Sequence, residues 1–161
     1  MERMFRDSVL DLAREHGFAR RLVNSGRLSR PCSLEGMSLQ SASCAGSGLA
    51  PGTAMPDAPV AGPKGRWLLP HFGDGFSLMA VEAGLPATLP PGVAPVVVSG
   101  QESRRIGAAA FLRDTQGLVA QRYGAGNLYL IRPDQHVAAR FAAPDTGEVT
   151  AANARATGRA A

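Results

Sequence analysis

The stretch that decides the fold is AAAFLRDTQGLVAQRYGAGNLYLIRPDQHVAARF, residues 108–141. Its apolar residues are the most regularly ordered of the chain, and they predict three short strands joined by two tight connections. The first strand covers Ala110–Leu112, Gly117 marks a turn, and Leu118–Ala120 begins a returning strand. We therefore expect a small β-rich core in this part of the sequence.

The second half of this stretch predicts a β-hairpin over Leu128–Phe141. Leu128–Ile131 is a nearly continuous apolar run, which is typical of a strand buried on both faces. In Arg132–Gln135, proline at the second position and aspartate at the third suit a type I turn. Apolar and other residues then alternate over Val137–Phe141, so we expect a strand with one face in water.

The same residues carry a resemblance to a known family. Asp114, Gly117, Tyr123 and the run Tyr129–Arg140 resemble the C-terminal domain of the FAD-dependent aromatic-ring hydroxylases, most closely the hydroxyphenylpropionate type related to phenol hydroxylase. In that family the domain has a thioredoxin-like fold and lacks the redox cysteine pair. The resemblance thus implies an α/β, thioredoxin-like domain without a redox CxxC.

An amphipathic helix is expected over Arg3–His16, with Gly17 as a plausible stop. Its apolar stripe has the spacing i, i+4, i+7 and i+11 and consists of Phe5, Val9, Leu12 and His16. Residues 5–7 and 18–29 resemble the segment that closes the flavin and substrate part of the hydroxylases. The resemblance implies that this helix packs against a flavin-binding catalytic domain or a second subunit.

A segment rich in glycine, serine, alanine and proline separates this helix from the predicted core, and residues 30–63 show no sustained periodicity. Within it, Ala50–Val60 resembles the approach to the thioredoxin-like domain, where the family carries a Pro-Gly-x-x-x-Pro-Asp signature. We therefore expect three parts: a helical segment at 1–29, a linker at 30–50 and the thioredoxin-like domain at 51–161.

The remaining elements follow from local signals. Phe76–Val81 and Pro95–Ser99 predict two strands, and the prolines between them leave room only for a short or broken crossover helix in 82–95. Asp145–Arg159 predicts a C-terminal helix that begins at an Asp145 or Thr146 cap.

Composition excludes several classes of protein. The 161 residues are 45% hydrophobic, which suggests one domain plus an appendage. The net charge is +4, but seven arginines and four acidic residues alternate in the first 30, without a module typical of nucleic-acid binding. No signal peptide or membrane span is evident, so we expect a cytoplasmic protein that binds neither nucleic acid nor membrane.

Several residues were considered as chemical groups and set aside. Cys32 and Cys44 do not form a CxxC, and no cysteine follows them, so we expect thiols in a reducing compartment. His71 has no second metal ligand at a useful spacing. Gly73 and Gly75 lack the lysine and the following helix of a phosphate loop, so we expect a turn feeding a strand.

Four polar residues of the deciding stretch are candidates for a site: Asp114, Tyr123, Arg132 and His136. Catalysis by a serine would need a positioned nucleophile and base, and no nucleophile elbow surrounds Ser77, Ser99 or Ser103. We expect His136 to brace the turn and Arg132 to pair with Asp134 or Asp114. The sequence therefore predicts no catalytic, cofactor-binding or metal-binding residue in this chain.

The resulting hypothesis is a C-terminal accessory portion of an FAD-dependent, NAD(P)H-using aromatic hydroxylase, with a packing or oligomerisation role. The resemblance implies FAD and NAD(P)H for the full-length family, and neither is expected to bind this chain, which would then not be catalytic alone. Two alternatives remain: a free-standing, non-redox thioredoxin-fold binding module, and a small enzyme with an unrecognised site.

Overall fold

A computed structural model describes residues 2–24, 31–41, 46–101 and 109–159. The chain forms two compact units, Met1–Cys32 and Ser33–Ala161. No helix in these described ranges is both long and apolar enough to cross a membrane.

The first unit is a pair of helices, α1 (Glu2–Glu15) and α2 (Gly17–Asn24). The helix expected at Arg3–His16 is confirmed, and Gly17 begins the next helix immediately. Arg20 of α2 donates from Nε to the Ala13 carbonyl, at 3.1 Å, so it satisfies a backbone acceptor at the end of α1. The contact between the helices buries Ala13 and Ala19, whereas Phe18 remains 56% exposed. The side chain of Phe5 lies outside the described residues.

Because the helix pair is a compact unit by itself, deletion of residues 1–29 should leave the sheet domain intact. We expect the remaining chain, residues 30–161, to melt within ~5 °C of the full chain and to be more soluble, since exposed apolar side chains are removed. Differential scanning calorimetry of the two proteins checks this. Loss of the cooperative transition after the deletion would show that the helices belong to the core of the sheet domain.

The second unit is a mixed α/β domain. Its helices are a 3₁₀ turn η1 (Leu69–His71), α3 (Leu118–Tyr123) and α4 (Thr146–Ala156). Its strands are β1 (Pro59–Gly62), β2 (Gly65–Trp67), β3 (Phe76–Val81), β4 (Val93–Ser99), β5 (Ala110–Asp114), β6 (Leu128–Ile131) and β7 (Val137–Phe141).

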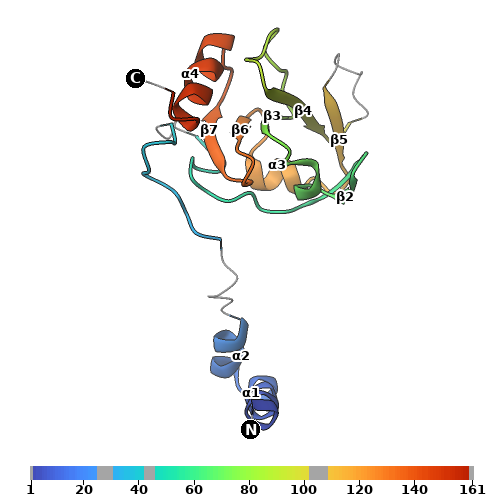
Figure 1. The fold of residues 1–161 in the computed structure, drawn as a ribbon. Coiled ribbons are helices and arrows are strands. Elements are labelled where there is room, and N and C mark those ends of the chain that lie inside the picture. The colour runs from blue at the N-terminus through green and yellow to red at the C-terminus, as the bar shows by residue number, and fades with distance from the viewer. Residues whose placement is uncertain (1, 25–30, 42–45, 102–108, 160–161) are drawn as a thin grey trace. The chain divides into compact units, whose positions relative to one another are not determined.

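The strands form one seven-stranded sheet in the order β2-β1-β5-β4-β3-β6-β7. The three central strands β5, β4 and β3 are parallel, and antiparallel pairs flank them on both sides. Figure 1 shows α4 beside the β6–β7 end of this sheet, where it contacts both strands. The sheet is thus mixed, with its parallel part in the middle.

Each face of the sheet carries a separate hydrophobic cluster. On one face, Val119 and Tyr123 of α3 pack with Tyr129 and Ile131. On the other face, Val149 of α4 packs in the same cluster as Leu130. Strand β6 is therefore covered on both sides, as the continuous apolar run Leu128–Ile131 predicts.

The hairpin predicted over Leu128–Phe141 is confirmed as β6 and β7. Gln135 N–H donates to the Arg132 carbonyl at 3.0 Å, which closes the predicted turn. The expectation of a wet face on the second strand is wrong, because Ala138 and Arg140 are both buried. The alternation is misleading because small alanines allow α4 to pack closely against the strand.

The returning strand expected at Leu118–Ala120 is also wrong, because these residues begin α3. Gly117 adopts a left-handed φ of 69° and turns the chain out of β5. The Asp114 side chain then accepts the N–H groups of Val119 and Ala120, at 2.9 and 3.0 Å. An aspartate that caps a helix start stabilises a helix where apolar periodicity alone suggests a strand.

The connection between the two predicted strands Phe76–Val81 and Pro95–Ser99 contains no helix in residues 82–92, and the strands form β3 and β4. Glu82 follows β3 with a φ of 49°, and its carboxylate accepts the Ser99 hydroxyl at 2.8 Å. The C-terminal helix is confirmed as α4, with Asp145 as its cap and Glu148 completing a capping box.

Residues assigned to the linker on sequence grounds make regular contacts with the sheet domain. Leu34 N–H donates to the Gly52 carbonyl at 2.8 Å, and Ser41 N–H to the Ala138 carbonyl at 2.9 Å. Gln40 is buried, and residues 59–62 form β1. Composition and periodicity do not reveal these contacts, because an extended segment that forms hydrogen bonds through its backbone needs no apolar periodicity.

Candidate functional site

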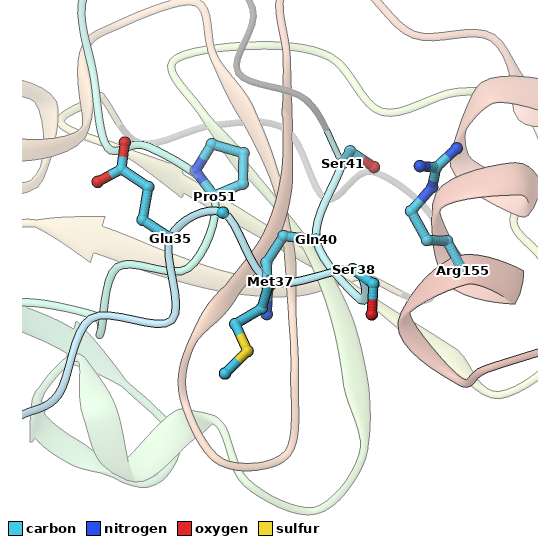
Figure 2. Close-up of a pocket in the computed structure, with 8 residues that line it drawn as sticks. Glu35, Met37, Ser38, Gln40, Ser41, Pro51 and Arg155 are labelled. Atoms are coloured by element: carbon cyan, nitrogen blue, oxygen red, sulfur yellow. The ribbon is translucent and has the colours of Figure 1, made fainter.

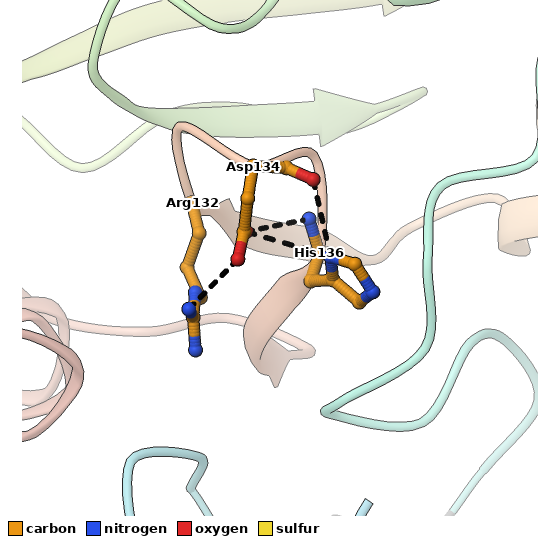
Figure 3. A network of polar contacts seen from close by, with 3 residues as sticks. All are labelled: Arg132, Asp134 and His136. Atoms are coloured by element: carbon orange, nitrogen blue, oxygen red, sulfur yellow. Dashed lines mark hydrogen bonds and ion pairs between the residues drawn. The ribbon is translucent and has the colours of Figure 1, made fainter. Parts of the chain in front are cut away.

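The hairpin turn gathers three polar side chains, Arg132, Asp134 and His136, which point toward one another in Figure 3. Arg132 forms an ion pair with Asp134 at 2.7 Å, as expected from the sequence. The His136 Nδ1 lies 3.1 Å from the Asp134 carbonyl oxygen, so the histidine braces the turn. These contacts account for the cluster as a way to fix the turn.

Asp114 and Tyr123 lie at the two ends of α3, away from this turn in the sequence and in their contacts. Asp114 is 5% exposed, and its Oδ2 receives both backbone bonds of the helix start. Its Oδ1 is buried without a hydrogen-bond partner in the described part of the chain. Of the four candidate site residues, Arg132 and His136 therefore lie together, because both contact Asp134. Asp114 caps the start of α3 instead.

Tyr123 instead pairs with Tyr129, which was not weighed as a site residue. The two rings meet edge to face, with their centroids 5.5 Å apart. The Tyr123 hydroxyl donates to the Pro56 carbonyl at 2.7 Å. Burial, followed by the nearby charges of Asp57 and Tyr129, raises the pKa of Tyr123 well above its ordinary value. The phenol therefore stays protonated at neutral pH and keeps this hydrogen bond.

A pocket of about 440 Å³ lies between the polar turns of residues 35–41 and the last turn of α4. It is lined by Glu35, Gly36, Met37, Ser38, Gln40, Ser41, Pro51 and Arg155. Figure 2 shows Glu35 and Arg155 at opposite sides of this pocket, with Gln40 between them. Sequence reasoning missed these residues because a polar, glycine- and serine-containing segment predicts only a linker.

Gln40 organises the floor of the pocket. In the amide orientation that satisfies its neighbours, it donates to the carbonyls of Met37 and Leu34, at 2.9 and 3.0 Å, and accepts from Arg132 at 3.2 Å. The amide is thus fully engaged with the protein. The geometry of Gln40 therefore suits a structural role.

The other candidate groups are dispersed. Ser99 donates to Glu82, and His71 lies 3.4 Å from the Gly65 carbonyl. Cys32 is exposed, whereas Cys44 and Ser103 lie outside the described residues. In the ranges that the structure describes, no three His, Cys, Asp or Glu side chains gather as a metal site would require.

The described residues do not fit the pyrophosphate of FAD either. That group needs open backbone N–H groups at a helix that follows a strand. In the described residues α3 and α4 follow strands, and the starts of these helices are occupied by the carboxylates of Asp114 and Asp145. Gly73 and Gly75 lead into β3, as the sequence predicts, and not into a helix.

Comparison with known proteins gives structural matches to flavin-dependent monooxygenases. The chain is similar to a part of aklavinone-11 hydroxylase, solved with FAD and aklavinone, at 26% identity and a TM-score of 0.48 over 68% of this chain. It is also similar to a part of the flavin-dependent monooxygenase PieE, solved with FAD and substrate, at 23% identity and a TM-score of 0.45 over 68% of this chain. The match spans 22% and 20% of the length of these proteins. No family model and no curated protein matches the sequence.

Proposed function

We propose that this chain is the C-terminal accessory portion of an FAD-dependent, NAD(P)H-using aromatic hydroxylase, with a packing or oligomerisation role and no active site of its own. In this proposal FAD and NAD(P)H bind elsewhere in the full-length enzyme, in the cytoplasm. The helix pair α1–α2 would contact the flavin-binding catalytic domain or a second subunit.

One observation carries the proposal: the two stretches that resemble the hydroxylase domain contact each other directly. Ala54, in the first stretch, forms a β-bridge with His136, in the second. Met55 N–H donates to the Gln135 carbonyl at 2.8 Å. Tyr123, also part of the resemblance, donates to Pro56. The two stretches thus lie side by side, as they would if they belonged to one domain of the hydroxylase type, and this supports the proposal.

The strand arrangement supports the thioredoxin-like part of the proposal. Two parallel strands, β3 and β4, adjoin the antiparallel hairpin β6–β7, and α4 packs on the hairpin. This is the order of central strands, hairpin and final helix that the resemblance implies. The crossover after β3 contains no helix, because Pro86, Pro90 and Pro91 occupy it.

Titration with FAD tests the absence of a cofactor site. We expect the purified protein to be colourless and to leave the absorbance and fluorescence of added FAD unchanged, because the helix starts that could hold a pyrophosphate are occupied by aspartates. Riboflavin serves as a matched ligand control. A stoichiometric yellow complex after removal of unbound FAD would contradict the proposal.

The DNA on the 5′ side of the Met1 codon separates the proposal from a free-standing binding module. A reading frame there that encodes GxGxxG between a predicted strand and helix would support a hydroxylase. A frame without such a motif would favour the module.

A further inference from the structure

A second concavity lies at the end of the sheet opposite to the β6–β7 hairpin, where β2 is the outermost strand. Its volume is about 430 Å³. The residues that line it come from β1, from β2 and from the turn after β5, and they include Pro59, Val60, Arg66, Trp67 and Gln116. We call this concavity the β2 pocket.

The apolar side of the β2 pocket contains the only tryptophan of the chain. Trp67 lies opposite Pro59 in the register of β1 and β2, and it is 54% exposed. Val60 belongs to the buried core, so the strand beside Trp67 is firmly held. Tryptophan has a large apolar surface, and its exposure to water is unfavourable. The pocket thus offers a rigid apolar surface that a partner could cover.

The polar side of the β2 pocket consists of Arg66 and Gln116, which are both exposed. Among the residues that the structure describes, neither side chain has a hydrogen-bond or ion-pair partner. The nearby cation Lys64, by contrast, is paired with Asp74. A guanidinium presents planar N–H donors that match a carboxylate. Arg66 therefore leaves a positive charge that a carboxylate would complement.

The exposure of these walls favours a protein segment over a small molecule. Small-molecule sites enclose about 70–90% of their ligand. In the β2 pocket, Arg66 and Trp67 are open to solvent, and all three residues of β2 are exposed. Arginine and tryptophan are also enriched among the residues that contribute most to binding between proteins. A segment that lies across β2 would cover both side chains.

We propose that the β2 pocket is a docking site for a segment of a partner protein in which an apolar side chain adjoins a carboxylate. The apolar side chain packs against Trp67 and Pro59. The carboxylate forms an ion pair with Arg66 and accepts a hydrogen bond from the amide of Gln116. The inference concerns the β1–β2 margin of the sheet, so it does not depend on the proposed function.

Titration with blocked pentapeptides tests the two parts of the proposal separately. The probe is fluorescein-labelled Gly-Leu-Glu-Leu-Gly, and fluorescence anisotropy measures its binding to the full chain. One matched peptide has glutamine in place of glutamate, and another has glycine in place of both leucines. We expect the glutamine peptide to bind about threefold more weakly, as for an exposed ion pair. The peptide without leucine should bind about tenfold more weakly, because it leaves Trp67 uncovered.

Variants of the protein assign these effects to residues. Arg66→Gln should abolish the preference for glutamate and leave the binding of the glutamine peptide unchanged. Arg155→Gln is the matched control and should keep the preference, since Arg155 is also exposed and has no side-chain partner in the described ranges. Trp67→Ala should weaken the glutamate and glutamine peptides alike, by about tenfold. Binding to the original chain should also shift the emission of Trp67, its only tryptophan.

Several outcomes would overturn the proposal. They are the absence of saturable peptide binding, equal binding of the glutamate and glutamine peptides, equal effects of Arg66→Gln and Arg155→Gln, and binding without a change in Trp67 emission. Benzoate provides the small-molecule comparison. If benzoate displaces the labelled peptide at lower concentration than the unlabelled peptide does, the pocket binds a small anion instead. Should Trp67→Ala fail to fold, Arg66→Gln decides, because it changes only an exposed side chain.

Discussion

Replacing Tyr129 with alanine should destabilise the sheet domain by about 3–5 kcal/mol, the usual cost of removing a large aromatic side chain from a core. The side chain is fully buried on β6, and its ring meets Tyr123 edge to face. Its hydroxyl accepts the Leu49 N–H at 3.2 Å and donates to the Tyr123 carbonyl. The substitution therefore leaves a cavity and also removes the hydroxyl that links Leu49 to Tyr123 at the end of α3. Urea denaturation followed by circular dichroism measures the change in the free energy of unfolding.

The matched variant Tyr129→Phe keeps the ring and removes only the hydroxyl. We expect it to cost about 1–3 kcal/mol, because the half-buried N–H of Leu49 and the carbonyl of Tyr123 then lose their hydrogen bonds to the hydroxyl. If Tyr129→Ala lowered the free energy of unfolding no more than Tyr129→Phe does, the ring would contribute nothing through packing. That outcome would contradict its edge-to-face contact with Tyr123.

Replacing Asp114 with alanine should cost about 2–3 kcal/mol of unfolding free energy. Asp114 accepts two helix-start N–H groups, and hydrogen bonds to a charged group are the stronger kind. Its removal leaves the buried N–H of Val119 without a partner and weakens the start of α3. Asp114→Asn retains one acceptor and should cost less than Asp114→Ala. Thermal and urea unfolding of both variants measure the difference.

Asp74→Ala provides the control for this prediction. Asp74 forms an ion pair with Lys64, and its side chain is 86% exposed. An exposed ion pair contributes only about 0–1 kcal/mol, so this variant should unfold almost as the original protein does. If Asp114→Ala proved as mild as Asp74→Ala, the cap would not be what directs residues 118–123 into a helix.

The central strands could be predicted because their residues face apolar surroundings on both sides. Leu78–Val81, within β3, and Leu128–Ile131 are continuous apolar runs, and turn residues follow the second of them, so the hydrophobic pattern and the turn signals agree. The capping box at Asp145 is equally local, because both of its partners lie within four residues. Such signals require no knowledge of the tertiary structure.

The features that escaped prediction depend on distant partners. The buried face of β7 is hidden by α4, and the order of residues 33–41 comes from the hairpin turn some 90 residues later. The helix α3 escaped prediction for another reason. The short apolar run Leu118–Ala120 suggests a strand, but the hydrogen bonds that Asp114 accepts from Val119 and Ala120 stabilise a helix there. For the candidate site, the sequence identified the Arg132–Asp134 pair but not Gln40. The hydrogen bond of Gln40 with Arg132 forms only when residues 33–41 lie against the hairpin turn.

The order of the segment around Leu49 and its partner hairpin along the chain has a consequence for biosynthesis. Leu49 and its partner Tyr129 are separated by 80 positions, and the segment around Leu49 precedes the hairpin in the sequence. A ribosome that adds about 5–20 residues per second completes the hairpin some 4–16 s after this segment has been made. Throughout that interval the nascent segment has no sheet edge to bind. The spacing of these elements along the gene thus sets the time for which the segment around Leu49 waits for its partner strand.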